Sequence, residues 1–218
     1  MMETKKRLRF YTLLAVALLV VDQVVKILVK THMQIGEEIP LLGTWCRLHF
    51  TENEGFAFGT SFGGATGKVA LTLFRLVASA AIAWFVVRLI RKQSRTSLVA
   101  SLTLIFAGAV GNVIDSCFYG LIFNESYYSL ATLFPPEGGY APFLQGRVVD
   151  MFYFPLFEFD WPMWIPILGG QHFEFFNAIF NIADATITIG VVWLLIDQLF
   201  ISPKYTKSEK KENTTEEK

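Results

Sequence analysis

The chain has 218 residues, of which 53% are hydrophobic and 15% aromatic, a composition that excludes an ordinary soluble domain and indicates an integral membrane protein. Basic and acidic residues balance at 19 each, so net charge gives no reason to expect a nucleic acid or another anionic partner. Cys46 and Cys117 form no CxxC spacing, and His32, His49 and His172 supply no ligand set, so we expect neither a disulfide framework nor a metal site.

Four apolar runs predict four membrane-spanning helices, at about residues 10–29, 68–90, 97–123 and 175–201. The first run follows the basic leader MMETKKRLR. At about 20 residues it is longer than the core of a signal peptide, and no small-x-small cleavage site follows it. We therefore expect residues 1–201 to form a single membrane-embedded domain, and the charged tail, 202–218, to be disordered.

The segments between the runs differ in character. Residues 31–67 are polar and Gly-rich, and alternation between Trp45 and Thr51 predicts a small β-element. Residues 124–174 are rich in Tyr, Phe, Pro, Gly and Trp, which suits a segment at the membrane interface. Lysine and arginine cluster at the N-terminus, at 88–95 and in the tail. The positive-inside rule therefore places both termini in the cytoplasm and the two long loops outside.

Charged side chains interrupt the spans at one depth. Asp22 and Lys26 fall in the outward half of the first span, while Asp115 lies roughly 27 Å from the cytoplasmic start of the third. Asp184 lies roughly 13 Å below the outer end of the fourth. An ionised carboxylate at membrane depth costs roughly 2.5 kcal/mol or more, so each needs a partner. Lys26 or Arg75 could neutralise Asp22 or Asp115.

Two spans also carry the same polar pattern. Offsets of four and three predict one helical face each for Gly108, Asn112 and Asp115, and for Asn177, Asn181 and Asp184. The asparagines suit helix-to-helix hydrogen bonding and a role in a site equally well. For Asp184 we expect Asp150, in GRVVDMF, as partner. Two carboxylates a few ångströms apart share one proton and can activate a water molecule.

Five motifs now stand in order along the chain: VDQVVK (21–26), NEGFAFG (53–59), GAVGNVID (108–115), GRVVDMF (146–152) and FNIAD (180–184). Together with the four-span topology they resemble the lipoprotein signal peptidases (signal peptidase II), a family of bacterial membrane aspartic proteases. The resemblance implies that Asp150 and Asp184 are the catalytic dyad. It also implies supporting positions at Asp22, Lys26, Asn53, Gly55, Ala57, Gly108, Asn112, Asp115, Asn177, Asn181 and Ala183.

The same resemblance implies a function. The family removes the signal peptide of prolipoproteins by cutting before a diacylglyceryl-modified cysteine, requires no metal or other cofactor, and is sensitive to globomycin. We expect the chain to lie in the bacterial inner membrane, in contact with lipid, with its site toward the outer face, and to act as a monomer.

Three features depart from the family pattern. Ser116 stands where many members have arginine, which leaves Arg147, Arg75 and Lys26 as possible counter-ions for Asp115. Phe56 replaces a usually small residue, which could narrow a substrate groove. About 34 residues separate Asp115 from Asp150, where most members have only a few. We expect the added aromatic segments to form a lid or a membrane-surface platform.

Two other function classes remain as alternatives. A small ion- or proton-coupled transporter could use the intramembrane carboxylates as a relay. Against it, the polar residues stop in the outer half of the spans, and no broken helices or inverted repeat are visible. A non-catalytic scaffold would keep its function after Asp150→Asn and Asp184→Asn.

Overall fold

The computed structural model describes residues 2–43, 45–55 and 64–202, which fall into two compact units. The first unit takes its described residues from 2–21, 74–111 and 182–202, and the second from 22–73 and 112–181. Most of the buried polar side chains described below belong to the second unit.

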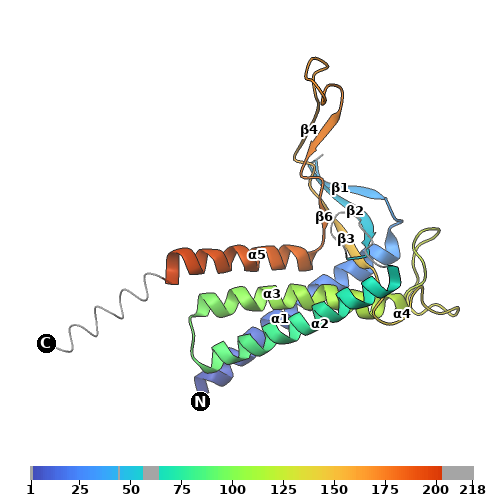
Figure 1. Cartoon of the computed structure of the whole chain (residues 1–218). Coiled ribbons are helices and arrows are strands. Elements are labelled where there is room, and N and C mark those ends of the chain that lie inside the picture. The colour runs from blue at the N-terminus through green and yellow to red at the C-terminus, as the bar shows by residue number, and fades with distance from the viewer. Residues whose placement is uncertain (1, 44, 56–63, 203–218) are drawn as a thin grey trace. The chain divides into compact units, whose positions relative to one another are not determined.

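Four helical segments are long and apolar enough to cross a membrane, as the sequence predicts (Figure 1). The first two are α1 (Met2–His32) and α2 (Gly64–Arg91). The third consists of α3 (Thr96–Ile114), the π-helical turn η2 (Asp115–Tyr119) and α4 (Gly120–Ile122). The fourth consists of α5 (Ile182–Ile196) and a second π-helical turn, η3 (Asp197–Ile201).

The fourth helix begins later than the sequence suggests, so the predicted start near residue 175 is wrong. Phe175 ends a strand, β5 (His172–Phe175), and β6 (Ile179–Phe180) follows before α5 begins at Ile182. Phe176, with φ of 67°, has a left-handed backbone that a right-handed helix cannot contain. Asn177 and Asn181 therefore do not share a helical face with Asp184.

The second unit contains the predicted β-element, as a four-stranded antiparallel sheet in the order β1-β2-β3-β6. Its other strands are β1 (Glu38–Leu42), β2 (Cys46–Asn53) and β3 (Val148–Tyr153). Val149 and Met151 of β3 are fully buried in an apolar core with Phe50, Tyr119 and Phe123. Since side chains alternate along a strand, Asp150 lies on the opposite face of β3 from Val149 and Met151.

The inserted segment that follows α4, up to β3, is hydrogen-bonded to the end of the third helical segment and does not project as a separate lid. Amide groups of the segment donate to helix carbonyls, Ala141 to Gly120 at 2.9 Å and Gly146 to Ser116 at 2.9 Å. A Cβ atom at position 146 would lie 2.1 Å from the Asp115 carbonyl oxygen, so this approach requires glycine. The insertion thus helps to fix where β3 starts.

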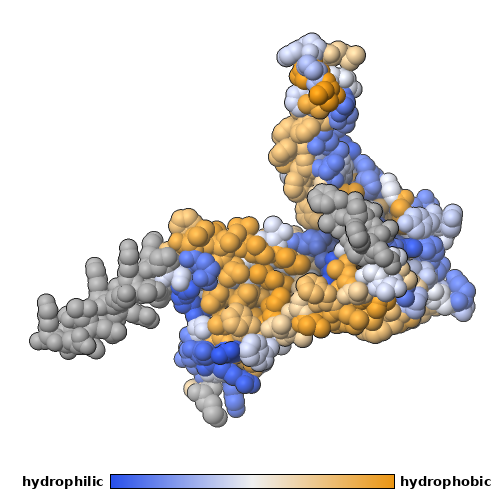
Figure 2. Space-filling model, in the orientation of Figure 1, coloured by the Kyte–Doolittle hydropathy of each residue, from blue (hydrophilic) through white to orange (hydrophobic). Residues whose placement is uncertain are grey.

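A second pair of strands, β4 (Phe157–Asp160) and β5, forms a separate two-stranded hairpin that joins β3 to β6. It extends away from the four-stranded sheet (Figure 1), and hydrophobic residues gather at its far end (Figure 2). The aromatic loop predicted between the third and fourth spans is thus divided into a packed segment and a projecting hairpin.

Candidate functional site

A buried ion cluster lies where α1 meets the π-helical turn. The Lys26 ammonium lies 3.0 Å from the Asp22 carboxylate and 2.8 Å from that of Asp115, and it donates to the Asn112 side-chain oxygen at 3.0 Å. Lys26 and Asp115 are fully buried and Asp22 nearly so. Among the three basic residues left open by the sequence, Lys26 is therefore the one paired with Asp115. Lys26 also pairs with Asp22 one helical turn before it in α1.

Further hydrogen bonds connect this cluster to the sheet. Gln23 donates to Asp115 at 2.9 Å and accepts from the Tyr119 hydroxyl at 3.1 Å. The Val149 amide, next to Asp150, donates to the other Asp115 oxygen at 3.3 Å. Gln23 was not among the residues that the sequence singled out, although it stands inside the VDQVVK motif. Asp115 therefore fixes both a helix and the strand that carries Asp150.

Asp150 is 3% exposed, and neutral amide groups are bonded to both of its oxygens. Asn181 donates to Oδ1 at 2.6 Å, and Asn53 donates to Oδ2 at 3.2 Å. Asn181 also donates to the Asn112 oxygen at 3.1 Å, the same oxygen that accepts from Lys26. A continuous path of hydrogen bonds therefore leads from the buried ammonium to the Asp150 carboxylate. These contacts orient Asp150 strongly.

Asp184 stands in the first turn of α5, three residues after Asn181. Its side chain is half-buried, and its backbone carbonyl accepts from the Thr188 hydroxyl at 2.8 Å. The first turn of a helix favours negative charge because its amide groups are unpaired and the helix dipole is positive there. The late start of α5 thus places this carboxylate at the end of a helix, and not within one.

Within the first unit, Gly108 allows α3 and α5 to approach closely beside Asp184. A Cβ atom at position 108 would lie 2.3 Å from the Ala183 carbonyl oxygen and 2.7 Å from Ile187 Cγ1. Ala183 itself is 1% exposed. Both residues thus lie where the start of α5 packs against α3.

We expect Gly108→Ala to destabilise the protein by about 1–3 kcal/mol, because overpacking forces two backbones apart. Thermal unfolding in detergent would measure the loss. Ala80→Val adds carbon to an exposed position of α2 and is the matched control. Equal melting temperatures for the two variants would contradict this account of the helix contact.

The remaining predicted site residues have different outcomes. Gly55 has a positive φ of 87°, and its amide donates to the Asn53 side-chain oxygen at 2.7 Å, so it supports Asn53. Asn177 is exposed on the link between β5 and β6. Ala57 and Phe56 lie outside the described residues. Arg147 belongs to another cluster.

Arg147 pairs with three carboxylates instead of Asp115. Its guanidinium lies 3.2 Å from Glu52, 3.0 Å from Glu54 and 2.5 Å from Glu125, and its amide donates to the Tyr140 hydroxyl at 2.7 Å. Burial alone would lower the pKa of Arg147. The bonds to these carboxylates raise the pKa by more than burial lowers it, so the pKa of Arg147 lies above its ordinary value. Burial also raises the pKa of the Tyr140 phenol. This second cluster was not predicted.

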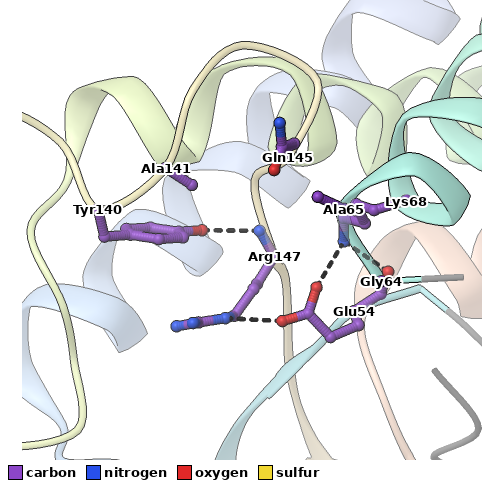
Figure 3. Close-up of a pocket in the computed structure, with 8 residues that line it drawn as sticks. All are labelled: Glu54, Gly64, Ala65, Lys68, Tyr140, Ala141, Gln145 and Arg147. Atoms are coloured by element: carbon purple, nitrogen blue, oxygen red, sulfur yellow. Dashed lines mark hydrogen bonds and ion pairs between the residues drawn. The ribbon is translucent and has the colours of Figure 1, made fainter.

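A cavity of about 350 Å³ lies beside Arg147, and Tyr140 and Glu54, which also line it, lie on the two sides of Arg147 (Figure 3). Lys68 donates to the Glu54 carbonyl at 2.5 Å, and its ammonium lies 3.5 Å from the Glu54 carboxylate. Nearby, the buried Lys30 ammonium pairs with Glu52 and donates to the Ser126 hydroxyl at 2.7 Å. Each cation of the cluster thus has a carboxylate partner. Because Arg147 pairs with Glu52 of β2 and with Glu125 of the insertion, the cluster connects the insertion to the sheet.

In the part of the chain that the structure describes, no three histidine, cysteine, aspartate or glutamate side chains gather as a metal site. Amide groups donate to both oxygens of Asp150, which suits a group that must hold one orientation while exchanging a proton with a water molecule.

A family model and two named relatives identify one family. The family model described as Signal peptidase (SPase) II matches residues 14–200. A lipoprotein signal peptidase of Porphyromonas gingivalis is 48% identical over 184 residues, covering 84% of this chain and 80% of that protein. One from Amoebophilus asiaticus is 36% identical over 198 residues, covering 89% and 79%. A bacterial membrane enzyme solved in meso at 2.3 Å aligns with a TM-score of 0.56 and 26% identity, over 87% of each chain.

Proposed function

The chain belongs to the signal peptidase II family of membrane aspartic proteases, and from that premise we propose that Asp150 and Asp184 are its catalytic dyad. The protein is a multi-pass bacterial membrane enzyme that processes prolipoproteins. What the family assignment leaves open is which residues do the chemistry, where the substrate is cut and how it enters.

One observation carries the assignment of the dyad. Asn181 donates to Asp150 at 2.6 Å and stands three residues before Asp184. The segment 181–184 therefore both bonds to one carboxylate and carries the other. Asn53 holds the second oxygen of Asp150, and the path through Asn112 ends on the Lys26 ammonium. Two carboxylates that share one proton are the arrangement found in aspartic proteases.

The mechanism follows from one ionised and one protonated carboxyl group. The ionised group removes a proton from a water molecule, whose oxygen attacks the scissile carbonyl carbon, while the protonated group donates to the carbonyl oxygen. The tetrahedral intermediate then collapses: the C–N bond breaks, and the nitrogen takes a proton from the group that received one from water. As the carbonyl re-forms, a hydroxyl of the intermediate returns a proton to the carboxylate that had protonated the carbonyl oxygen. Both carboxyl groups return to their starting protonation without a covalent enzyme intermediate.

The substrate determines the remaining details of the proposal. The cut falls just before a cysteine that carries a diacylglyceryl group, so the substrate enters laterally from the bilayer with its signal segment and acyl chains still in lipid. The enzyme lies in the inner membrane with both termini cytoplasmic and the dyad toward the outer face. Residues 1–201 act as a single domain and as a monomer.

A shared proton predicts a bell-shaped dependence of kcat/KM on pH. At low pH both carboxyl groups are protonated and the base is lost, whereas at high pH both are ionised and the acid is lost. Cleavage of a purified lipid-modified prolipoprotein across pH, with folding checked at each pH, would measure this profile. Activity that is constant across the range in which the protein stays folded would contradict a two-carboxyl mechanism.

Asn181→Ala tests whether Asn181 positions the base. We expect kcat to fall about 10–100-fold with little change in KM, because Asp150 loses a donor and small displacements of a reacting group are costly. Asn124→Ala removes another asparagine, bonded to the Thr132 amide within the insertion, and should retain activity. A kcat for Asn181→Ala equal to that of this control would contradict the positioning role.

A further inference from the structure

The β4–β5 hairpin has two chemically different faces. On one face, Phe157 and Phe175 stack with their ring centroids 4.6 Å apart, and Phe159 lies 5.1 Å from Phe173. On the other, Glu158 pairs in register with Glu174, and Asp160 accepts a 2.8 Å bond from His172. Acidic groups thus lie on the face opposite the aromatic rings.

The aromatic face is exposed, and an isolated two-stranded hairpin is at best marginally stable in water. Phe157 is 52% exposed and Phe175 is 44% exposed. Exposed aromatic surface of this kind, bordered by charged residues, marks an interaction surface. The hairpin therefore requires a partner that covers aromatic groups and leaves the acidic face in water.

The end of the hairpin, residues 161–171, contains no charged residue. Three of its side chains are among the most exposed apolar groups of the described chain: Met163 at 84%, Trp164 at 81% and Ile167 at 91%. The turn is nevertheless ordered, since the Gly170 amide donates to the Trp161 carbonyl at 2.8 Å and the Gly169 amide to Ile165 at 2.9 Å. An uncharged, hydrogen-bonded end that contains Trp161 and Trp164 suits the lipid headgroup region.

The chain also brings the hairpin close to a membrane. Phe175 precedes Ile182, the first residue of the fourth membrane helix, by seven residues. A fully extended backbone advances at most about 3.6 Å per residue, so the base of the hairpin lies within roughly 25 Å of that helix end. The lipid around that helix end is therefore close enough for the hairpin to contact it.

We propose that the aromatic face and uncharged end of the β4–β5 hairpin dock into the headgroup region of the outer leaflet, with the acidic face toward water. The hairpin has no lysine or arginine from 156 to 175, so apolar burial rather than attraction to anionic lipid drives the contact. If Asp150 and Asp184 form the proposed dyad, docking of the hairpin also affects the catalytic site. The hairpin joins the strand of Asp150 to the segment of Asn181 and Asp184, and it holds that segment at the lipid surface where the substrate arrives.

Site-specific fluorescence in phosphatidylcholine vesicles tests this docking without using cleavage. An environment-sensitive dye is attached to Ile167→Cys at the end of the hairpin and, as the matched control, to Glu158→Cys on its acidic face. The wild type, whose Cys46 and Cys117 are buried, measures background labelling. We expect nitroxide-labelled lipid to quench the dye at position 167 at least about twofold more than at 158, and aqueous iodide to show the reverse preference.

A dye on Trp164→Cys provides the second position and should behave like the one at 167. Iodide quenching of 164 and 167 as strong as at 158 would place the hairpin in water and overturn the proposal. Protection from both quenchers would mean that protein covers the hairpin, which also overturns it. Because the readout is independent of proteolysis, an inactive enzyme that still docks would count against the proposed dyad and not against docking.

Discussion

Asp150→Asn and Asp184→Asn should each lower kcat by about 10³-fold or more while the protein stays folded, because either change removes one of the two proton-transfer groups. Asparagine keeps the size of the side chain, but at position 150 it can accept from only one of the two asparagines that donate to Asp150, so the folding of each variant must be measured. Steady-state cleavage of a lipid-modified prolipoprotein, with melting temperatures measured in parallel, would give both quantities.

The double variant adds information about the pair. Two residues that act as one unit give non-additive losses, so Asp150→Asn with Asp184→Asn should cost little more than either change alone. Asp160→Asn, on the exposed face of the hairpin, is the matched control and should remain active. Substantial cleavage by either single variant would remove that residue from the mechanism.

Lys26→Met should have the largest effect on stability. Lys26 is fully buried, and its removal leaves Asp22 and Asp115 without the ammonium that lies 3.0 and 2.8 Å from them. Breaking a buried ion pair by removing one partner typically costs about 3–5 kcal/mol, because a charge remains buried without compensation. Thermal unfolding in detergent would measure the loss, and Lys5→Met, at an exposed position, is the control.

Neutralising the cluster as a whole distinguishes charge from shape. Asp22→Asn and Asp115→Asn, added to Lys26→Met, remove the stranded charges and should restore much of the lost stability. If the triple variant is as unstable as Lys26→Met alone, the loss comes from packing and not from uncompensated charge. If Lys26→Met melts like the wild type, the cluster does not stabilise the fold.

The helices and the buried ion cluster could be predicted because their signals are local. Apolar runs of span length identify the helices, and the spacing of four between Asp22 and Lys26 places both charges on one side of α1. The sequence could not decide which basic residue pairs with Asp115. That pairing is between residues 89 positions apart and depends on how helices pack, for which the sequence carries no local signal.

The start of the fourth helix could not be predicted for a different reason. HFEFFNAIF is apolar enough to extend the following helix, and a short apolar run of this kind does not distinguish strand from helix. Pairing of Phe180 with Phe152 and of Ile179 with Tyr153 decides for strand. As a result Asn181 lies next to Asp150 through tertiary structure, and the helical spacing that first drew attention to it is irrelevant.

The cluster around Arg147 was missed because its partners come from distant parts of the chain. Glu125 lies 22 residues before Arg147, and Glu52 lies 95 residues before it. No pattern of spacing connects such groups, whereas burial of Glu52 makes a cation necessary once the fold exists. The same limit applies to the hairpin. Its two stretches FEFD and HFEF alternate visibly in the sequence, but only their pairing shows that the aromatic rings of both strands share one face.

The products of the purified protein test the central claim, that this chain cuts lipid-modified prolipoproteins at one defined bond. Mass spectrometry would compare a prolipoprotein before and after diacylglyceryl modification. We predict a mature product that begins at the modified cysteine, together with an intact precursor where the modification is absent. Cleavage at another bond, or equal cleavage of the unmodified precursor, would contradict the account.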